Sequence, residues 1–120
     1  MPPERIPTQI TLHQKSRVLE IDFSDGQGFR VPYEYLRVYS RSAEVRGHGP
    51  GQEVLQTGKR NVEIGALEAV GSYAVQPAFS DGHSTGIYSW GYLYDLGEQQ
   101  DQLRVEYLKK LEDNRASRDK

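Results

Sequence analysis

The chain has 120 residues, of which 36% are hydrophobic, and 15 Lys and Arg against 17 Asp and Glu give a formal net charge of -2 at pH 7. This balance excludes a general electrostatic attraction to nucleic acid or to an anionic membrane surface. The absence of cysteine excludes a disulfide scaffold, a thiolate nucleophile and a zinc or iron–sulfur site held by thiolates.

The domain organisation follows from length and from the chain ends. One domain is expected at this length, and we place it at residues 8–113. Residues 1–7 contain three prolines and predict a flexible N-terminus, and residues 114–120 lack periodicity and predict a disordered tail. No apolar region typical of a signal peptide or membrane span is seen. We therefore expect a soluble, cytoplasmic protein.

The first half of the chain predicts three β-strands, at residues 8–13, 18–23 and 29–31, because apolar and polar residues alternate there. Asp25-Gly26 between the second and third strands indicates a hairpin turn. Pro32 ends the third strand, and residues 33–37 suit a short helical turn with proline at its start.

Glycine-rich residues 46–61 predict a loop before the pattern resumes in the second half. Strands are expected at residues 62–70 and 73–79, with Pro77 marking an edge strand or a bulge. Asp81-Gly82 predicts a second hairpin, whose return strand would be residues 85–88.

Residues 98–115 predict a C-terminal helix, because Leu103, Tyr107 and Leu111 recur at helical spacing. Glu106 and Lys110 are four residues apart and are expected to form an ion pair on its surface.

The two hairpins resemble each other, since Phe23-Ser24-Asp25-Gly26 recurs as Phe79-Ser80-Asp81-Gly82. With one residue inserted, an aromatic pattern also recurs: Val31, Tyr33, Tyr35 and Leu36 correspond to Tyr88, Trp90, Tyr92 and Leu93. We interpret this as an internal duplication. The predicted fold is a small, β-rich, two-layer α+β domain with antiparallel hairpins in two repeated halves, short helical turns and a C-terminal helix.

Two features suggest ligand chemistry, and each also has a simpler explanation. Residues 51–59 superficially resemble a phosphate-binding loop, but the glycine spacing is wrong and Lys59 is followed by Arg60 rather than Ser or Thr, so we favour a flexible connection. His83 follows Asp81 by two residues. Either the carboxylate orients the imidazole in a ligand site, or Asp81 binds the turn backbone and His83 packs over it.

The remaining histidines, His13 and His48, are expected on the surface, and no two histidines share a metal-chelating spacing.

A dense aromatic cluster contains Tyr88, Trp90 and Tyr92. It indicates either core or a partner-facing surface, because Tyr and Trp dominate protein interfaces. We take these three residues and Arg37 as interaction candidates. A stacking platform for nucleic acid is disfavoured, since no basic groove accompanies the aromatic residues.

Two stretches of the chain resemble the gamma-butyrobetaine-hydroxylase-like N-terminal domain family: Leu19-Glu20-Ile21-Asp22-Phe23-Ser24-Asp25-Gly26 with residues 29–37, and Val70-Gly71-Ser72-Tyr73-Ala74-Val75 with residues 79–93. Residues 40–49 are similar to a stand-alone bacterial branch of that family. The resemblance covers residues 8–96.

The resemblance implies a zinc site that this chain has lost. In the hydroxylases the domain holds zinc through three cysteines and a histidine, and those positions fall on Ser40, Ser42, Val45 and His83. We therefore expect no structural zinc, no other metal and no cofactor. The oxygenase chemistry of those enzymes resides in a separate domain and is not carried over to this chain.

The leading hypothesis is a non-enzymatic accessory domain in the cytoplasm whose partner is another protein. Similar domains are fused to P-loop iron–sulfur carriers, which by analogy suggests a link to iron–sulfur protein maturation. The alternative is a small-ligand or metal-binding protein that uses His83, Asp81 and the glycine-rich loop. An enzyme of unknown type ranks third.

Overall fold

In the computed structural model, the structure describes residues 6–42 and 54–119. The first half forms a three-stranded antiparallel sheet of β1 (Pro7–His13), β2 (Val18–Phe23) and β3 (Gly28–Pro32), in that order. Helix α1 (Tyr33–Val38) follows directly. The alternation in β2 buries Leu19, Ile21 and Phe23 on one face, as the sequence predicts.

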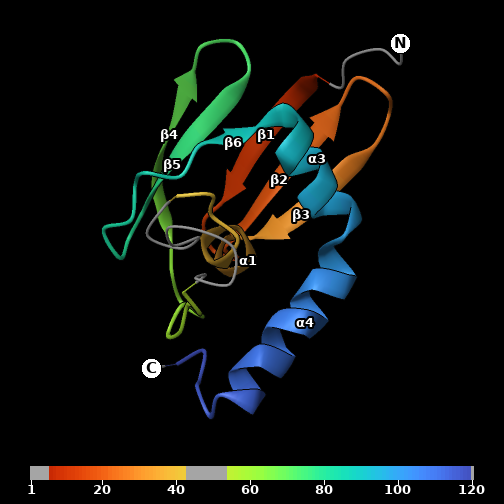
Figure 1. The fold of residues 1–120 in the computed structure, drawn as a ribbon. Helices are drawn as coiled ribbons and strands as arrows, with labels where there is room; N and C mark the ends of the chain where they lie inside the picture. Colours follow the sequence, from red (N-terminus) through yellow and green to blue (C-terminus); the bar gives the residue numbers. More distant parts are fainter. Residues whose placement is uncertain (1–5, 43–53, 120) are drawn as a thin grey trace.

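The second half repeats this order of elements. Strands β4 (Ile64–Val70), β5 (Ala74–Phe79) and β6 (Tyr88–Ser89) form another antiparallel sheet, and helices α3 (Trp90–Glu98) and α4 (Gln100–Asp113) complete the chain. Figure 1 shows the two sheets side by side, with α4 running diagonally below the first sheet. The predicted α+β fold with a C-terminal helix is confirmed.

The two predicted hairpin turns have the same geometry. Gly26 and Gly82 adopt φ of +90° and +89°, which confirms the expected glycine conformation. In the first turn the amide of Phe23 donates to the Gln27 carbonyl at 2.8 Å, and in the second the amide of Phe79 donates to the His83 carbonyl at 2.9 Å. The turns are equivalent, while the duplication itself stays an interpretation.

The return strand predicted at residues 85–88 is wrong. Only Tyr88 and Ser89 pair with β5, opposite Val75 and Ala74. Thr85 instead donates to the Ser42 hydroxyl, and the His83 imidazole contacts Ser40, so the intervening residues bridge to the end of α1. At Pro77, β5 therefore has a strand partner on one side only, as expected for an edge.

The helix predicted at residues 98–115 is confirmed as α4, which spans Gln100–Asp113. The aromatic residues Trp90 and Tyr92 lie in a separate nine-residue helix, α3. The Ser89 hydroxyl caps the start of α3 by accepting a hydrogen bond from the Tyr92 amide at 3.2 Å. Gln99 separates α3 from α4. In the part of the chain that the structure describes, neither helix is long and apolar enough to cross a membrane.

The main core lies between the two halves and is rich in tyrosine. Tyr33 and Tyr88 are fully buried in it, together with Leu19, Ile21, Leu36 and other apolar residues from both sheets. A smaller cluster of Val38, Tyr107 and Leu111 joins α1 to α4. This second cluster places α4 beside the end of α1.

Residues 114–119, for which the sequence predicts disorder, make defined contacts. The carbonyls of Ser117 and Arg118 accept hydrogen bonds from the amides of Gly58 and Arg60 at 2.9 and 3.0 Å. The Arg118 guanidinium donates twice to the Glu34 carboxylate, at 2.8 and 2.6 Å. The tail is therefore fastened to α1 and to the segment before β4.

Candidate functional site

Three of the four residues that the resemblance assigns to the lost zinc site meet in one place. Ser40 Oγ lies 2.9 Å from His83 Nε2, and the Ser42 amide donates to Ser40 Oγ at 3.3 Å. All three residues are buried. Val45, the fourth position, and His48 lie outside the described residues. Among the residues described, no group of three or more His, Asp or Glu side chains is placed to hold a metal ion.

Asp81 joins the second turn to two cations. Its Oδ2 accepts from Arg37 Nε at 2.8 Å and from Lys59 Nζ at 2.5 Å, and its Oδ1 accepts from the His83 amide at 3.1 Å. Burial raises the pKa of this carboxyl, but the hydrogen bonds and the charge of Arg37 outweigh burial and lower the pKa to about 2. The hydrogen bond from the His83 amide matches one of the two interpretations of Asp81 drawn from the sequence, in which its carboxylate binds the backbone of the turn.

Two of the four interaction candidates are core residues. Tyr88 has no exposed surface, and its hydroxyl donates to the Leu36 carbonyl. Arg37 is 6% exposed and is held by Asp81. Neither residue is accessible to a partner protein, so the prediction that Tyr88 and Arg37 belong to an interaction surface is wrong. Both are buried because each half of the chain covers the other.

The other two candidates, Trp90 and Tyr92, are half-buried. Trp90 Nε1 donates to the Ser72 carbonyl at 2.8 Å, which holds the indole against the β4–β5 turn. Tyr92 lies on α3, and its hydroxyl donates to the Tyr39 carbonyl at 2.5 Å.

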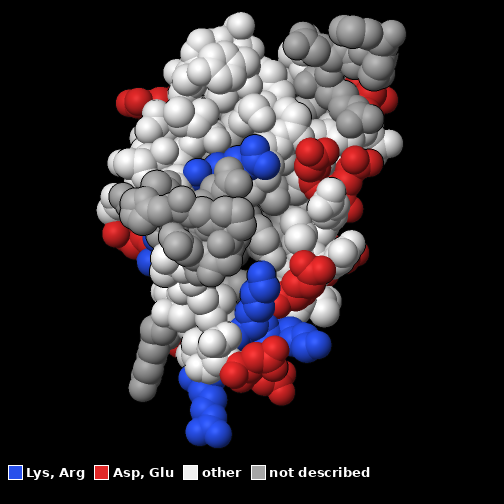
Figure 2. All heavy atoms as spheres, in the orientation of Figure 1, with Lys and Arg blue, Asp and Glu red and all other residues white. Residues whose placement is uncertain are grey.

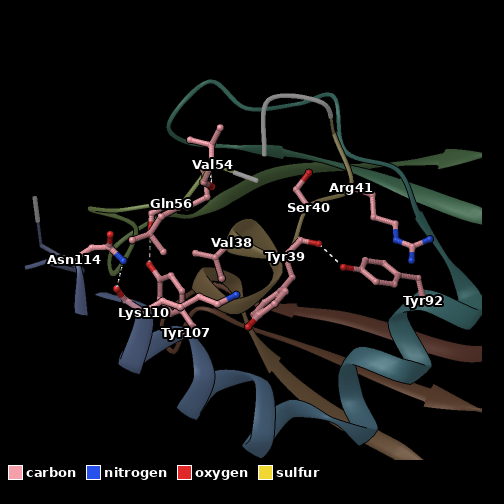
Figure 3. A pocket seen from close by; sticks show the side chains of 11 residues that line it. Val38, Tyr39, Ser40, Arg41, Val54, Gln56, Tyr92, Tyr107, Lys110 and Asn114 are labelled. Carbon is pink, nitrogen blue, oxygen red and sulfur yellow. Dashed lines mark hydrogen bonds between the residues drawn. The ribbon is translucent and has the colours of Figure 1, made fainter. Parts of the chain in front are cut away.

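A cavity of about 510 Å³ lies beside Tyr92, between the end of α1, residues 54–56, α3 and α4. We call it the tyrosine pocket. Figure 3 shows its walls, which come from four separate segments of the chain. The described residues that line it are Val38, Tyr39, Ser40, Arg41, Val54, Leu55, Gln56, Tyr92, Tyr107, Lys110 and Asn114.

Three tyrosine hydroxyls tie the walls of this pocket together. Tyr39 donates to the Leu103 carbonyl at 2.8 Å, Tyr92 to the Tyr39 carbonyl at 2.5 Å, and Tyr107 to the Gln56 carbonyl at 2.6 Å. Burial raises the pKa of Tyr39 and of Tyr107 to about 12, so both hydroxyls stay protonated at neutral pH. Tyr39 and Tyr107 therefore contribute aromatic rings to the pocket wall and no negative charge.

The charged side chains of the pocket are both cations. The Arg41 guanidinium lies over the Tyr92 ring, 4.2 Å from its centroid. Lys110 reaches from α4 toward Tyr39 (Figure 3). Neither a carboxylate nor a histidine is among the described lining residues. The arrangement therefore suits binding of an anion and offers no acid–base pair for proton transfer.

Among the pocket residues, the sequence singled out Tyr92 as an interaction candidate and Ser40 as a position of a lost zinc ligand. Val54 and Leu55 fall in the loop predicted at residues 46–61, and Lys110 was expected to form a surface ion pair with Glu106. In the structure, Glu106 accepts a hydrogen bond from Gln102 at 3.2 Å, and Lys110 turns into the pocket. Tyr107 and Lys110 share a helix face, but only the fold shows what that face meets.

Comparisons with known proteins agree on one family. The sequence profile described as gamma-butyrobetaine hydroxylase-like, N-terminal, matches residues 10–94. Two proteins solved by NMR in solution are similar over 98% of the chain. One has 44% identity, a TM-score of 0.84 and 92% of its own length covered, and the other has 50% identity, a TM-score of 0.82 and 90% covered.

A crystal structure at 1.93 Å resolution is also similar, with 41% identity and a TM-score of 0.63. It is a protein of unknown function from Acidithiobacillus ferrooxidans ATCC 23270 that belongs to the DUF971 family, and the match covers 76% of this chain and 91% of that one. No curated protein matches this chain. The profile ends before α4, which supplies Tyr107, Lys110 and Asn114 to the pocket.

Proposed function

The chain belongs to the gamma-butyrobetaine hydroxylase-like N-terminal family, and we propose that it acts as a non-enzymatic domain that binds a small ligand in the tyrosine pocket. The observation that carries this proposal is a cavity of about 510 Å³ with apolar and aromatic walls and two cations. Small-molecule sites are typically concave, mostly apolar and roughly 300–1,000 Å³ in volume, with few polar groups.

This proposal keeps the small-ligand hypothesis drawn from the sequence but places the site in the tyrosine pocket rather than at His83, Asp81 and the glycine-rich loop. His83 and Asp81 are already engaged with Ser40, Arg37 and Lys59. Residues 46–53 of the glycine-rich loop lie outside the described residues and add nothing to the argument. The tyrosine pocket, by contrast, contains Lys110, for which the described residues supply no ion-pair partner.

The test is an NMR titration of the full chain with small aromatic fragments, neutral and anionic. Shifts are expected at residues 38–41, 54–56 and 107–114. Leu55→Trp fills the pocket and should abolish these shifts. Leu108→Trp, on an exposed part of α4 outside the pocket lining, is the matched control and should keep them. Shifts confined to another surface, or no shifts, would contradict the proposal.

We propose, as a second function, that the chain binds another protein in the cytoplasm. Tyr73 is exposed, and its carbonyl accepts a hydrogen bond from the amide of the half-buried Trp90 at 3.1 Å. Such aromatic surfaces are common in protein interfaces. A link to iron–sulfur protein maturation rests on the family resemblance alone. Loss of a reproducible partner in a pull-down with Trp90→Ala, with Leu55→Trp unaffected, would separate this function from ligand binding.

A further inference from the structure

On the premise that the tyrosine pocket is a ligand site, we propose that its ligand is a small organic anion, with a carboxylate or phosphate near Lys110 and a flat apolar body against the tyrosine rings. Lys110 and Arg41 are the charged residues among the described lining, and both are positive. The described lining therefore carries a charge of opposite sign to the net charge of the chain.

The charge of Lys110 is the first argument. The structure pairs Arg37 and Lys59 with Asp81, and Arg118 with Glu34. Lys110 has no carboxylate within ion-pair distance in the described chain, and its potential helix partner Glu106 instead accepts from Gln102. Figure 2 shows acidic and basic side chains next to one another over α4, and a separate group of basic side chains higher on the same face. An anionic ligand would supply a counter-charge that the described residues do not provide.

The walls of the pocket are the second argument. Val38 and Leu55 give it apolar surface, and Tyr39, Tyr92 and Tyr107 give it rings whose hydroxyls already donate to backbone carbonyls. A ligand made only of charge would leave this apolar surface wet, whereas burying an apolar body contributes about 25 cal/mol per Å². A purely apolar ligand would leave Lys110 beside it without a counter-charge from any described residue. A molecule that has both an anionic group and an apolar body matches both the charge of Lys110 and the apolar walls.

The place of Arg41 sets the expected specificity. Its guanidinium is stacked on Tyr92, and Figure 3 shows it at the opposite end of the pocket from the α4 backbone that carries Lys110. A planar guanidinium binds carboxylates and phosphates through paired hydrogen bonds. We expect Lys110 to provide the main attraction and Arg41 to strengthen binding of ligands with a second anionic group.

The experiment compares benzoate, phenyl phosphate and neutral benzamide as probes, each titrated into the full chain and followed by NMR. The two anions are expected to bind at least tenfold more tightly than benzamide, and whichever anion binds more tightly identifies the headgroup. Lys110→Gln should reduce anion binding at least fivefold and leave benzamide binding unchanged. Lys109→Gln, an exposed neighbour outside the pocket lining, is the matched control and should change neither.

The outcomes separate this inference from the proposed function. If benzamide binds in the pocket as tightly as benzoate and phenyl phosphate, the anion specificity is overturned and the ligand site stands. Equal loss of anion binding in Lys109→Gln and Lys110→Gln would also overturn it, since general surface charge would then explain the effect. If none of the three probes shifts pocket residues, both proposals fail.

Discussion

Gly82 holds a backbone conformation that side chains disfavour. Its φ is +89°, and no atom lies within 4 Å of the position that a Cβ would occupy, so strain in a substituted residue would come from the backbone rather than from a clash. Non-glycine residues in such regions cost on the order of 1–3 kcal/mol, and β-branched residues are especially disfavoured. The second turn therefore depends on glycine for its shape.

We predict that Gly82→Val lowers the free energy of unfolding by about 1–3 kcal/mol. Gly91→Val is the control, because Gly91 also has open space around it but lies in α3 without a positive φ. That variant should stay within about 0.5 kcal/mol of the wild type. Both are measured by urea denaturation. Wild-type stability of Gly82→Val would mean that the second turn is wrongly placed.

Asp81 predicts a pH-dependent contribution to stability. Its folded pKa of about 2 lies below the ordinary 3.8, so the folded state favours the ionised carboxylate. The stabilisation is fully present above the ordinary pKa and is lost as the pH falls toward 2.

We expect Asp81→Asn to be less stable than the wild type at pH 7, because Arg37 and Lys59 lose their carboxylate partner. The difference should shrink between about pH 4 and pH 2. Urea denaturation at pH 7, 4 and 2.5 measures it, with Asp95→Asn, exposed on α3, as the control. A difference that is independent of pH would show that the ion pairs do not stabilise the fold.

At the scale of the elements, the sequence predicts the strands and turns that depend on local sequence patterns. Alternation located the strands of the first sheet, and Asp-Gly located both turns. The return strand predicted at residues 85–88 is limited to Tyr88 and Ser89, because His83 and Thr85 bond to serines more than 40 positions away. No local pattern carries that information. The tail is a similar case, since its partners Glu34, Gly58 and Arg60 are distant in the sequence.

The tail contacts give a third prediction. Glu34 has an 11% exposed side chain and would lose its bidentate partner in Arg118→Ala. We expect faster hydrogen exchange at the Gly58 and Arg60 amides, which donate to the tail carbonyls, with a loss of about 1 kcal/mol of stability. Arg115→Ala, at an exposed position within the tail, is the control and should leave both amides protected. Unchanged exchange in Arg118→Ala would contradict a fastened tail.

For the whole molecule, the candidate site is a product of the assembly of the two halves. Tyr39 follows α1 in the first half, whereas Tyr92 and Tyr107 come from helices of the second half. Each is joined to a distant segment by a hydroxyl bond. The sequence identified an aromatic cluster but could not separate Tyr88, which is core, from Tyr92, which lines the pocket. That distinction depends on tertiary packing.

The positions that the family resemblance assigns to a zinc site also link the two halves, since Ser40 and Ser42 follow α1 and His83 follows β5. Hydrogen bonds now join these segments: Ser40 Oγ to His83 Nε2 at 2.9 Å, and Thr85 to Ser42 at 2.8 Å. Hydroxyls are poor zinc ligands beside thiolates, and one imidazole cannot complete a tetrahedral site. We predict that the purified, untagged protein contains no stoichiometric zinc. Elemental analysis measures this, and one equivalent of zinc would contradict it.

The converse variant tests the same geometry by restoring the ligands. Ser40→Cys, Ser42→Cys and Val45→Cys together should create a site with His83, because Ser40 Oγ already lies within hydrogen-bond distance of the imidazole. We expect one equivalent of zinc and a thiolate-to-metal absorption band with cobalt. Adding His83→Ala to the triple variant should weaken metal binding, because tetrahedral zinc then lacks its fourth protein ligand. A folded triple variant that takes up no metal would refute the correspondence of these four positions with the zinc ligands of the family.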